Sequence, residues 1–490
     1  MNFNIMYLYK VVILAAILVA VSCQSYRAGI VIYKPVSILG PADTNLKINA
    51  NISARLIKSY KDQADIFVLP EYGLTNIPPK SLTSVYQYST TINEVGYDVC
   101  GSKEKVDIQL RDLACAAKDS NAYVIANLFE SVQDNAYYLT TVGFDRTGTI
   151  VVKCRNYHIN STQLNTTTEQ NPCTFTANIN NDKVNFAILF EIDMMYPIPN
   201  ASKSENLIMT ASMVNRLPLE FGLSLYEGFA VANGANLLVS AFTDPTRSGS
   251  GIFYSNGTST VAFNPEDVPG GNASHAVLIR SVPVKASKLK EVNVNAAYVG
   301  TKPITLSNLP FTDYGLSDTS KVLKKHCVDK AMKRCCSFSA EIEGNSIAPY
   351  KWVALVNTTI LDQATNSLIC AIALPSASIA NAISFKNLTI STDIDKAEVL
   401  LSIPVGLNDK SLSSDFHYNA DSHSIMSTSN DKIVVLGIIE ILGGTPTPAP
   451  GTENQNKPSS NGVDRFGKRS DQYCMGLLIF YISIRYLFSL

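Results

Sequence analysis

Short apolar runs alternate with amphipathic segments through the first half of the chain, and this alternation limits the fold more than any other feature. Residues 26–33, 66–70, 184–190 and 206–211 have the length and apolar character of buried strands. Two more runs flank the turn sequence DRTG at 145–148, which is typical of a hairpin. Strands that alternate with helices, together with hairpins, predict a layered α/β fold with a mixed sheet.

Amphipathic helices are predicted between these strands. Apolar residues recur on one face of a helix in three segments, at 52–60, 110–117 and 221–229. In such folds, sites form where strands end at the carboxyl edge of a sheet. Glu71, Glu191 and the segment after Cys154 all lie at such ends. An acid that directly follows a buried strand is costly unless it is paired, hydrated or useful, so these positions are candidates for a site.

The pattern of apolar runs changes near residue 301. From there to residue 442 the apolar runs read as strands with few helical stretches between them. A chain of 490 residues with 46% hydrophobic residues can bury one large core and a smaller one. We therefore predict an α/β domain over residues 24–300 and a β-rich domain over residues 301–442.

The amino terminus reads as a signal peptide over residues 1–23. Lys10 precedes an apolar run, and Ser22 and Cys23 are small residues suited to cleavage before Gln24. An uncleaved anchor is the alternative, but the run is short for a bilayer span of about 20 residues. Secretion agrees with eight N-glycosylation sequons, at Asn51, Asn160, Asn165, Asn200, Asn256, Asn272, Asn357 and Asn387.

Eight cysteines lie outside the signal and the extreme carboxyl tail, an even number that suits disulfides in an oxidising compartment. We predict that Cys154 pairs with Cys173, because the two bracket a polar loop that carries two sequons. A metal site is the alternative interpretation. The cysteine spacings match no zinc pattern and the five histidines are scattered, so no metal is predicted.

The carboxyl terminus has the layout of a glycosylphosphatidylinositol signal. A linker rich in Pro, Gly, Ser, Thr and Asn covers residues 443–462, and a polar spacer and an apolar tail follow over residues 463–490. Attachment is expected at Ser460 or Asn461, with removal of the tail. A spanning helix is the alternative, but the tail is short and contains Arg485. The expected location is the extracellular face of the cell membrane, or alternatively secretion.

The net charge of −1 gives no reason to expect a nucleic-acid partner. Nothing in the residue pattern indicates a cofactor, and protein partners are not identified by it.

Four ordered motifs resemble the vanin/biotinidase family of the carbon–nitrogen hydrolase, or nitrilase, superfamily. They are DIFVLPEYGLTN at 65–76, YHI at 157–159, NFAILFEIDMMYP at 185–197 and DPTRSGSGIF at 244–253. The resemblance covers nearly the whole chain, from the signal to the anchor tail. It implies a nitrilase-type αββα sandwich followed by a smaller β-rich domain, and cleavage of linear amides of the pantetheine or biotin-amide type.

The resemblance also implies a catalytic triad that this chain has lost in part. Family members use a glutamate base, a lysine that steadies the oxyanion and a cysteine nucleophile. Glu71 matches the glutamate. The lysine position is Ile159, and the cysteine of the family's T-C-F-D segment is replaced by Glu191, while Asp193 keeps the acid. Because neither replacement can do the chemistry of the residue it replaces, we expect a pseudoenzyme, with a small amide as its ligand.

Other interpretations remain open at the sequence level. An altered amidohydrolase would need another nucleophile, and Ser212 is available, but no histidine is evidently placed to activate it. His158 adjoins Ile159, where it can be structural or part of the site. Glu71 and Glu191 have the residue types of a glycosidase acid–base pair, although nothing else indicates a sugar substrate. A purely structural adhesion protein with a closed pocket is the remaining alternative.

Overall fold

The computed structural model describes most of residues 24–442. The predicted signal peptide, linker and anchor tail lie outside the described residues. Outside them too lie short stretches within 24–442, namely 38–40, 76–81, 134–135, 160, 162, 168–172, 200–202, 218, 245, 248, 288, 290, 295–296, 299–304, 307–320, 330–333, 343–349, 357–358, 361–362, 375–384, 395–398, 403–404, 407–415, 420 and 428–431.

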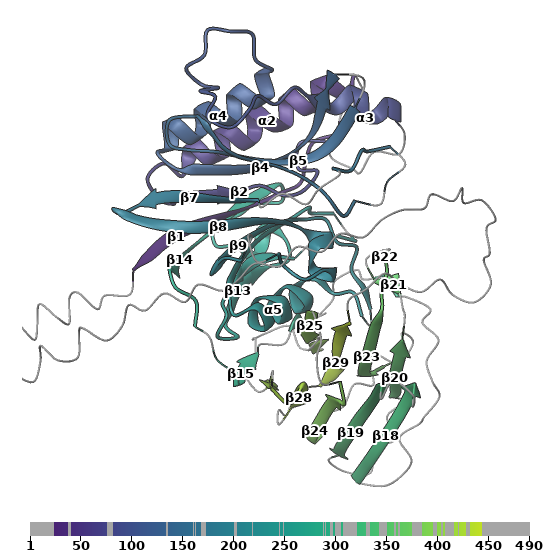
Figure 1. Ribbon diagram of the computed structural model, residues 1–490. Helices are drawn as coiled ribbons and strands as arrows, with labels where there is room; N and C mark the ends of the chain where they lie inside the picture. Colours follow the sequence, from purple (N-terminus) through teal and green to yellow (C-terminus); the bar gives the residue numbers. More distant parts are fainter. Residues whose placement is uncertain are drawn as a thin grey trace, which may run out of the picture. The chain divides into compact units, whose positions relative to one another are not determined.

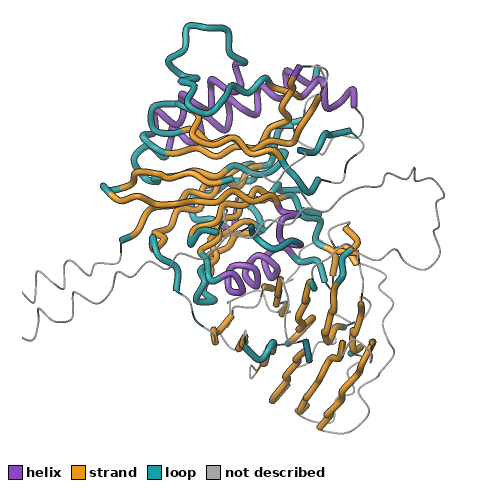
Figure 2. Tube along the Cα trace, viewed as in Figure 1, coloured by secondary structure: helices purple, strands orange, loops and turns teal. Residues whose placement is uncertain are grey.

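Two stacked sheets build the first part of the chain (Figure 1; Figure 2). The first sheet has the strand order β14-β1-β2-β4-β5-β6, with β3 beside β4. Its strands are β14 (His275–Pro283), β1 (Ser25–Tyr33), β2 (Ile66–Val68), β3 (Ser89–Thr90), β4 (Tyr123–Val132), β5 (Ala136–Phe144) and β6 (Ile150–Arg155). Strands β1, β2 and β4 are parallel, whereas β14, β5 and β6 run antiparallel to their neighbours, so the sheet is mixed as predicted.

The second sheet has the strand order β13-β12-β11-β9-β8-β7. Its strands are β13 (Ser259–Ala262), β12 (Ser250–Phe253), β11 (Asn236–Ala241), β9 (Asn206–Ala211), β8 (Asp182–Phe190) and β7 (Thr174–Ile179). The central strands β8, β9 and β11 are parallel. Their carboxyl ends therefore meet at one edge, which is where the sequence places Glu191.

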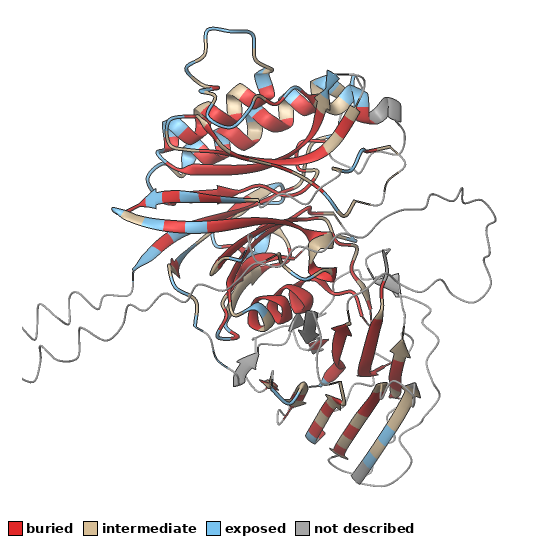
Figure 3. Ribbon diagram, in the orientation of Figure 1, coloured by how far each residue is buried: buried red, intermediate tan, exposed pale blue. Residues whose placement is uncertain are grey.

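Helices cover the outer faces of both sheets. Figure 1 shows α2 (Ala42–Ser59) and α4 (Ile108–Ser120) along the outer face of the first sheet, and the short α3 (Leu82–Tyr88) lies nearby. Their apolar stripes pack with β1, β2 and β4 in one buried cluster. A second cluster fills the space between the two sheets. Helix α5 (Gly222–Asn233) packs on the second sheet and is buried on nearly every side (Figure 3). The αββα sandwich expected from the sequence is confirmed.

The remaining described strands form the β-rich part. One of its sheets has the order β15-β27-β28-β24-β19-β18, and the other has the order β16-β26-β29-β23-β20 with β25 beside β29. The first comprises β15 (Glu291–Val294), β27 (Phe416–Asn419), β28 (Ser424–Ser427), β24 (Phe385–Thr392), β19 (Arg334–Ile342) and β18 (Lys321–Asp329). The second comprises β16 (Ala297–Tyr298), β26 (Val405–Gly406), β29 (Ile433–Ile441), β23 (Ser367–Ala373), β20 (Lys351–Val356) and β25 (Val399–Ser402).

Strand pairing refines the domain boundary predicted at residue 301. Strands β15 and β16 precede that residue but pair with β27 and β26 of the β-rich part. The reason is that the chain leaves the first sheet at the end of β14. Two short pairs complete the strands, β10 (Arg216–Leu217) with β17 (Thr305–Leu306), and β21 (Thr359–Ile360) with β22 (Gln363–Ala364).

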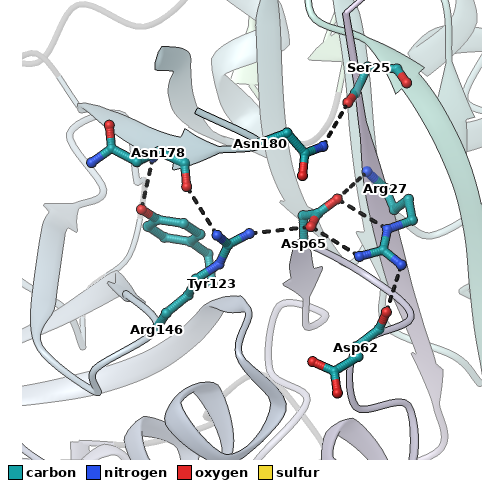
Figure 4. Close-up of polar contacts among 8 residues, drawn as sticks. All are labelled: Ser25, Arg27, Asp62, Asp65, Tyr123, Arg146, Asn178 and Asn180. Carbon is teal, nitrogen blue, oxygen red and sulfur yellow. Dashed lines mark hydrogen bonds and ion pairs between the residues drawn. The ribbon is translucent and has the colours of Figure 1, made fainter. Parts of the chain in front are cut away.

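Asp65 ties the amino ends of several strands together (Figure 4). Its carboxylate accepts hydrogen bonds from the backbone and the guanidinium of Arg27 on β1, and from Arg146 in the β5–β6 turn at 3.2 Å. Arg146 also donates to the carbonyl of Asn178 on β7 and lies over the ring of Tyr123 at 5.6 Å. The cluster joins the two sheets at the end opposite to Glu71, which leaves the carboxyl ends free for a site.

Four disulfides pair all eight cysteines considered above. They are Cys100–Cys115, Cys154–Cys173, Cys327–Cys335 and Cys336–Cys370. The predicted pairing of Cys154 with Cys173 is confirmed, and it joins the end of β6 to the segment before β7. Five predicted glycosylation sites are described and all are exposed, namely Asn51, Asn165, Asn256, Asn272 and Asn387. Asn160, Asn200 and Asn357 lie outside the described residues, as do Ser460 and Asn461.

Candidate functional site

Glu71 sits in a tight turn immediately after β2. The turn is held by the amide of Gly73, which donates to the carbonyl of Pro70 at 3.1 Å. Tyr72 has a positive φ of 54° and donates its amide to the Asn127 side chain on β4 at 3.4 Å. A non-glycine residue in this conformation is uncommon and requires support from its surroundings. The turn therefore aims Glu71 away from the first sheet in a fixed direction.

Glu191 begins a single 3₁₀ turn, η2 (Glu191–Met195), directly after β8. Strands β8 and β9 are parallel neighbours with Phe190 opposite Thr210. This register brings Glu191 level with the end of β9. There the backbone N–H of Ser212 donates to Oε2 of Glu191 at 2.5 Å.

Ser212 joins the two glutamates. Its hydroxyl donates to Oε1 of Glu71 at 3.0 Å, while its amide is bound to Glu191. Both carboxyl groups are removed from water, since Glu71 is 6% exposed and Glu191 is 9% exposed. The convergence of Glu71 and Glu191 predicted from the strand ends is thus present, and a serine contacts both side chains.

Burial shifts the acidity of both glutamates. Burial raises the pKa of Glu71 to about 7, against hydrogen bonds from Ser212 and the Tyr72 hydroxyl that lower it. The pKa of Glu191 is raised to about 8, first by burial and then by the charge of Glu71. Because like charges close together cannot both ionise cheaply, the pair holds at least one proton at neutral pH.

Arg247 was not assigned a role by sequence reasoning, although it lies in the fourth quoted motif. The positive charge of Arg247 lowers the pKa of Glu191, whereas the negative charge of Glu220 raises it. Each of these two residues already has an ion-pair partner, because Arg247 pairs with Asp244 at 2.9 Å and Glu220 with Arg216. An arginine is therefore close enough to act on Glu191, but it is shared with Asp244.

Ile159 lies half-buried and packs against the apolar cluster between the two sheets. Tyr72 and Ile192, the neighbours in sequence of the two glutamates, pack against the same cluster. An isoleucine here supplies contact but no charge and no hydrogen bond. The site therefore contains two acids and a hydroxyl, without the ammonium that the resemblance implies at this position.

His158 proves to be held by specific contacts. Its Nδ1 lies 2.7 Å from Oδ1 of Asp193, and its ring stacks on Tyr196 with centroids 3.7 Å apart. The other oxygen of Asp193 accepts the amide of Phe190 at 2.8 Å. The pair lines a cavity of about 250 Å³, which Glu71, Ile159 and Glu191 do not line. The glutamate pair is thus not part of the lining of this cavity, and Asp193 both caps the 3₁₀ turn and orients the histidine.

The described residues contain no group of three or more His, Cys, Asp or Glu side chains arranged to hold a metal. They also contain no helix with the length and apolar character needed to cross a bilayer.

No family model matches the chain. It is 27% identical over 254 residues to vanin-like protein 3 of Drosophila melanogaster, covering 48% of this chain and 47% of that protein. It is 25% identical over 249 residues to a pantetheinase of Bos taurus, covering 46% of this chain and 48% of that protein. The chain thus spans about half the length of the curated relatives that it matches.

Two solved structures are similar in part. A Saccharomyces cerevisiae member of branch 10 of the nitrilase superfamily has a TM-score of 0.41 and 16% identity, covering 53% of this chain and 90% of that chain. An amidase from Nesterenkonia, of the same superfamily, has a TM-score of 0.37 and 15% identity, covering 53% of this chain and 92% of that chain.

The stacked sheets, with acids at the carboxyl ends of their parallel strands, agree with the nitrilase-type sandwich that the resemblance implied. The curated relatives that it matches are vanin-like and pantetheinase proteins, and this likeness supports a vanin-like family.

Proposed function

We propose that this chain is a vanin-like ectodomain that has lost thiol-dependent amidase chemistry. The observation that carries the proposal is the burial and protonation of Glu191, which holds the cysteine position. Its carboxyl is buried, bound by the Ser212 amide and protonated at neutral pH because its pKa is raised to about 8. A protonated carboxyl is a poor nucleophile, and an anhydride formed by its carboxylate would be readily reversed.

Ile159 supports the same proposal from the lysine position. Oxyanion stabilisation is usually a large part of catalysis, and an isoleucine packed in an apolar cluster provides none. We infer that the domain acts by binding rather than by turnover, with a small amide as the ligand class suggested by its pantetheinase relative.

The proposed location is the extracellular face of the cell membrane. The four disulfides and the five exposed sequons support passage through an oxidising compartment. The anchor proposal rests on the small residues at 460–462, the polar spacer and the apolar tail of the sequence. Release of the protein from intact cells by a phosphatidylinositol-specific phospholipase tests it, and retention after treatment would contradict it.

A turnover assay with pantetheine and biocytin analogues tests the loss of activity. Purified ectodomain should cleave neither amide above a heat-denatured control. Cleavage that iodoacetamide abolishes would contradict the proposal, because it would require a reactive thiol.

One contact favours a second candidate, an altered amidohydrolase. The Ser212 hydroxyl donates to Glu71, whose raised pKa of about 7 suits a general base at neutral pH. In this scheme Ser212 Oγ bonds to the amide carbonyl carbon while Glu71 takes its proton. Glu71 then passes the proton to the departing amine, and water hydrolyses the acyl ester. Turnover that is lost in Ser212→Ala and insensitive to iodoacetamide would favour this candidate over the first.

A further inference from the structure

The cavity beside His158 lies at the carboxyl ends of β6 and β8. Its volume is about 250 Å³. One wall is apolar, with Ile188, Phe190, Pro197 and Ile198, together with the Cys154–Cys173 disulfide. The rest of the lining includes polar side chains from β6 and the segment that follows it. A cavity with an apolar wall and a few converging polar groups is the usual form of a small-molecule site.

His158 is fixed in this wall with one ring nitrogen uncommitted. Nδ1 is bound to Asp193, the backbone amide donates to Asn156, and the ring is stacked on Tyr196. Because an ionised Asp193 can only accept, Nδ1 carries the proton, and Nε2 makes no hydrogen bond to any described residue. The side chain is 11% exposed, so Nε2 depends on the contents of the cavity for a partner.

Three side chains of the wall have a hydrogen-bond donor without a partner among the described residues. Arg155 gives Nε and one terminal nitrogen to Glu130, both at 2.8 Å, which leaves its other terminal nitrogen unbound within the described chain. The hydroxyls of Tyr157 and Tyr196 also lack a described hydrogen-bond partner.

The two carboxylates of the wall already have partners. Both oxygens of Asp193 are bound, and Glu94, whose side chain is 86% exposed, pairs with Lys153. Lys153 is itself satisfied by Glu94, Glu130 and the carbonyl of Ile92. A ligand that bonds to the uncommitted Arg155 nitrogen and accepts from the tyrosine hydroxyls brings acceptors of its own.

We propose that this cavity binds a small carboxylate, whose oxygens accept from Arg155 and from protonated His158 while its hydrocarbon part lies on the apolar wall. The proposal does not depend on the loss of amidase chemistry, because it uses none of Glu71, Ile159 or Glu191. Arg155 suits the task since a guanidinium donates in a fixed planar fork that matches carboxylate geometry.

Binding should be coupled to proton uptake at His158. Neutral His158 offers a lone pair at Nε2, which repels a carboxylate, whereas protonated His158 offers a second donor. The charged groups that face it are Asp193 from the 3₁₀ turn, Lys153 and Arg155 from β6, and Glu94. The glutamate pair titrates near neutral pH, so a His158 variant is needed to assign the effect.

Calorimetric titration of the full ectodomain with butanoate and with its neutral isostere butanamide tests the proposal. Butanoate should bind on the order of tenfold or more tightly at pH 6 than at pH 8, approaching one proton taken up per ligand. Butanamide should bind more weakly and with no such dependence. His158→Gln should remove the pH dependence, and the control His275→Gln, at the start of β14 and outside the cavity wall, should keep it.

Tyr196→Phe provides a second variant that keeps the ring stack but removes one donor. It should weaken butanoate several-fold at both pH values and leave the proton uptake in place. The proposal is overturned if butanoate fails to saturate below about 10 mM. It is also overturned if butanoate and butanamide bind alike, or if His158→Gln keeps the pH dependence. Amidase assays on the same samples test the proposed loss of activity separately, so their outcome does not decide whether the cavity binds a carboxylate.

Discussion

The hydroxyl of Ser212 donates a hydrogen bond to Glu71 across 141 residues of sequence, at a distance of 3.0 Å. The same serine donates its backbone amide to Glu191. The contact explains how a site with two carboxyl groups and no lysine stays assembled. One residue at the end of β9 satisfies an acid from each sheet.

Ser212→Ala should destabilise the protein more at pH 8 than at pH 5. The Ser212 hydroxyl lowers the pKa of Glu71, so its loss costs the ionised form of Glu71 more than the protonated form. Glu71 is protonated at pH 5 and largely ionised at pH 8, since its pKa is about 7. The extra loss at pH 8 should be about 1 kcal/mol in urea unfolding.

Ser240→Ala is the matched control for this measurement. Ser240 is buried at the end of β11, and its hydroxyl donates to the neutral carbonyl of Val31. Its loss should therefore cost the same free energy of unfolding at both pH values. A cost of Ser212→Ala that is likewise independent of pH would show that Glu71 does not ionise in this range.

Much of this arrangement could be predicted from the sequence because it follows from strand ends. The predicted strand at 206–211 coincides with β9. Glu71 and Glu191 converge because each follows a strand end and the two sheets are stacked, so that Ser212 contacts both acids. The role of Ser212 as the link could not be predicted. It depends on the register of β8 against β9 and on the direction in which the Tyr72 turn aims Glu71.

The surroundings of the site were harder to predict for the same reason. Arg247 acts on Glu191 through space from a loop after β11, and its sequence neighbours give no sign of that partner. His158 pairs with Asp193 only because the 3₁₀ turn carries Asp193 back toward the end of β6. Short turns of this kind leave no periodic pattern in a sequence.

Glu191→Cys alone should not restore useful amidase rates. Glu71 would be present as the base, but Ile159 would still leave the oxyanion without a cation. The double variant with Ile159→Lys should be faster by about 10²–10³, the usual value of one oxyanion donor. The measurement is single-turnover cleavage of a pantetheine amide by both variants. Equal rates for the single and double variants would show that another group, such as Arg247, supplies the charge.

Replacing both Cys154 and Cys173 by serine should destabilise the protein by about 3 kcal/mol, the value of the chain-entropy model for a loop of this length. The bridge closes 19 residues and joins the two sheets beside the His158 cavity. Urea unfolding of the variant measures the loss. Replacing Cys100 and Cys115 by serine serves as a control for loop length. That disulfide closes a loop of 15 residues and does not line the cavity. Butanoate binding should weaken only in the first variant if the bridge shapes the cavity.

Glu191→Gln should stabilise the protein, and more so at pH 8 than at pH 5. The pKa of Glu191 is raised from 4.5 to about 8 by burial and by Glu71, so the folded protein holds a proton that the unfolded chain releases above its own pKa. The free energy of unfolding of the wild type therefore falls as pH rises through the window between these two values. Glutamine keeps the acceptor for the Ser212 amide but has no proton to lose. The advantage of the variant should grow by roughly 2 kcal/mol between pH 5 and pH 8, allowing for the charge shared with Glu71. Thermal unfolding of both proteins at the two pH values measures it. A constant difference, or a loss of stability at pH 8, would mean that Arg247 rather than a proton neutralises Glu191.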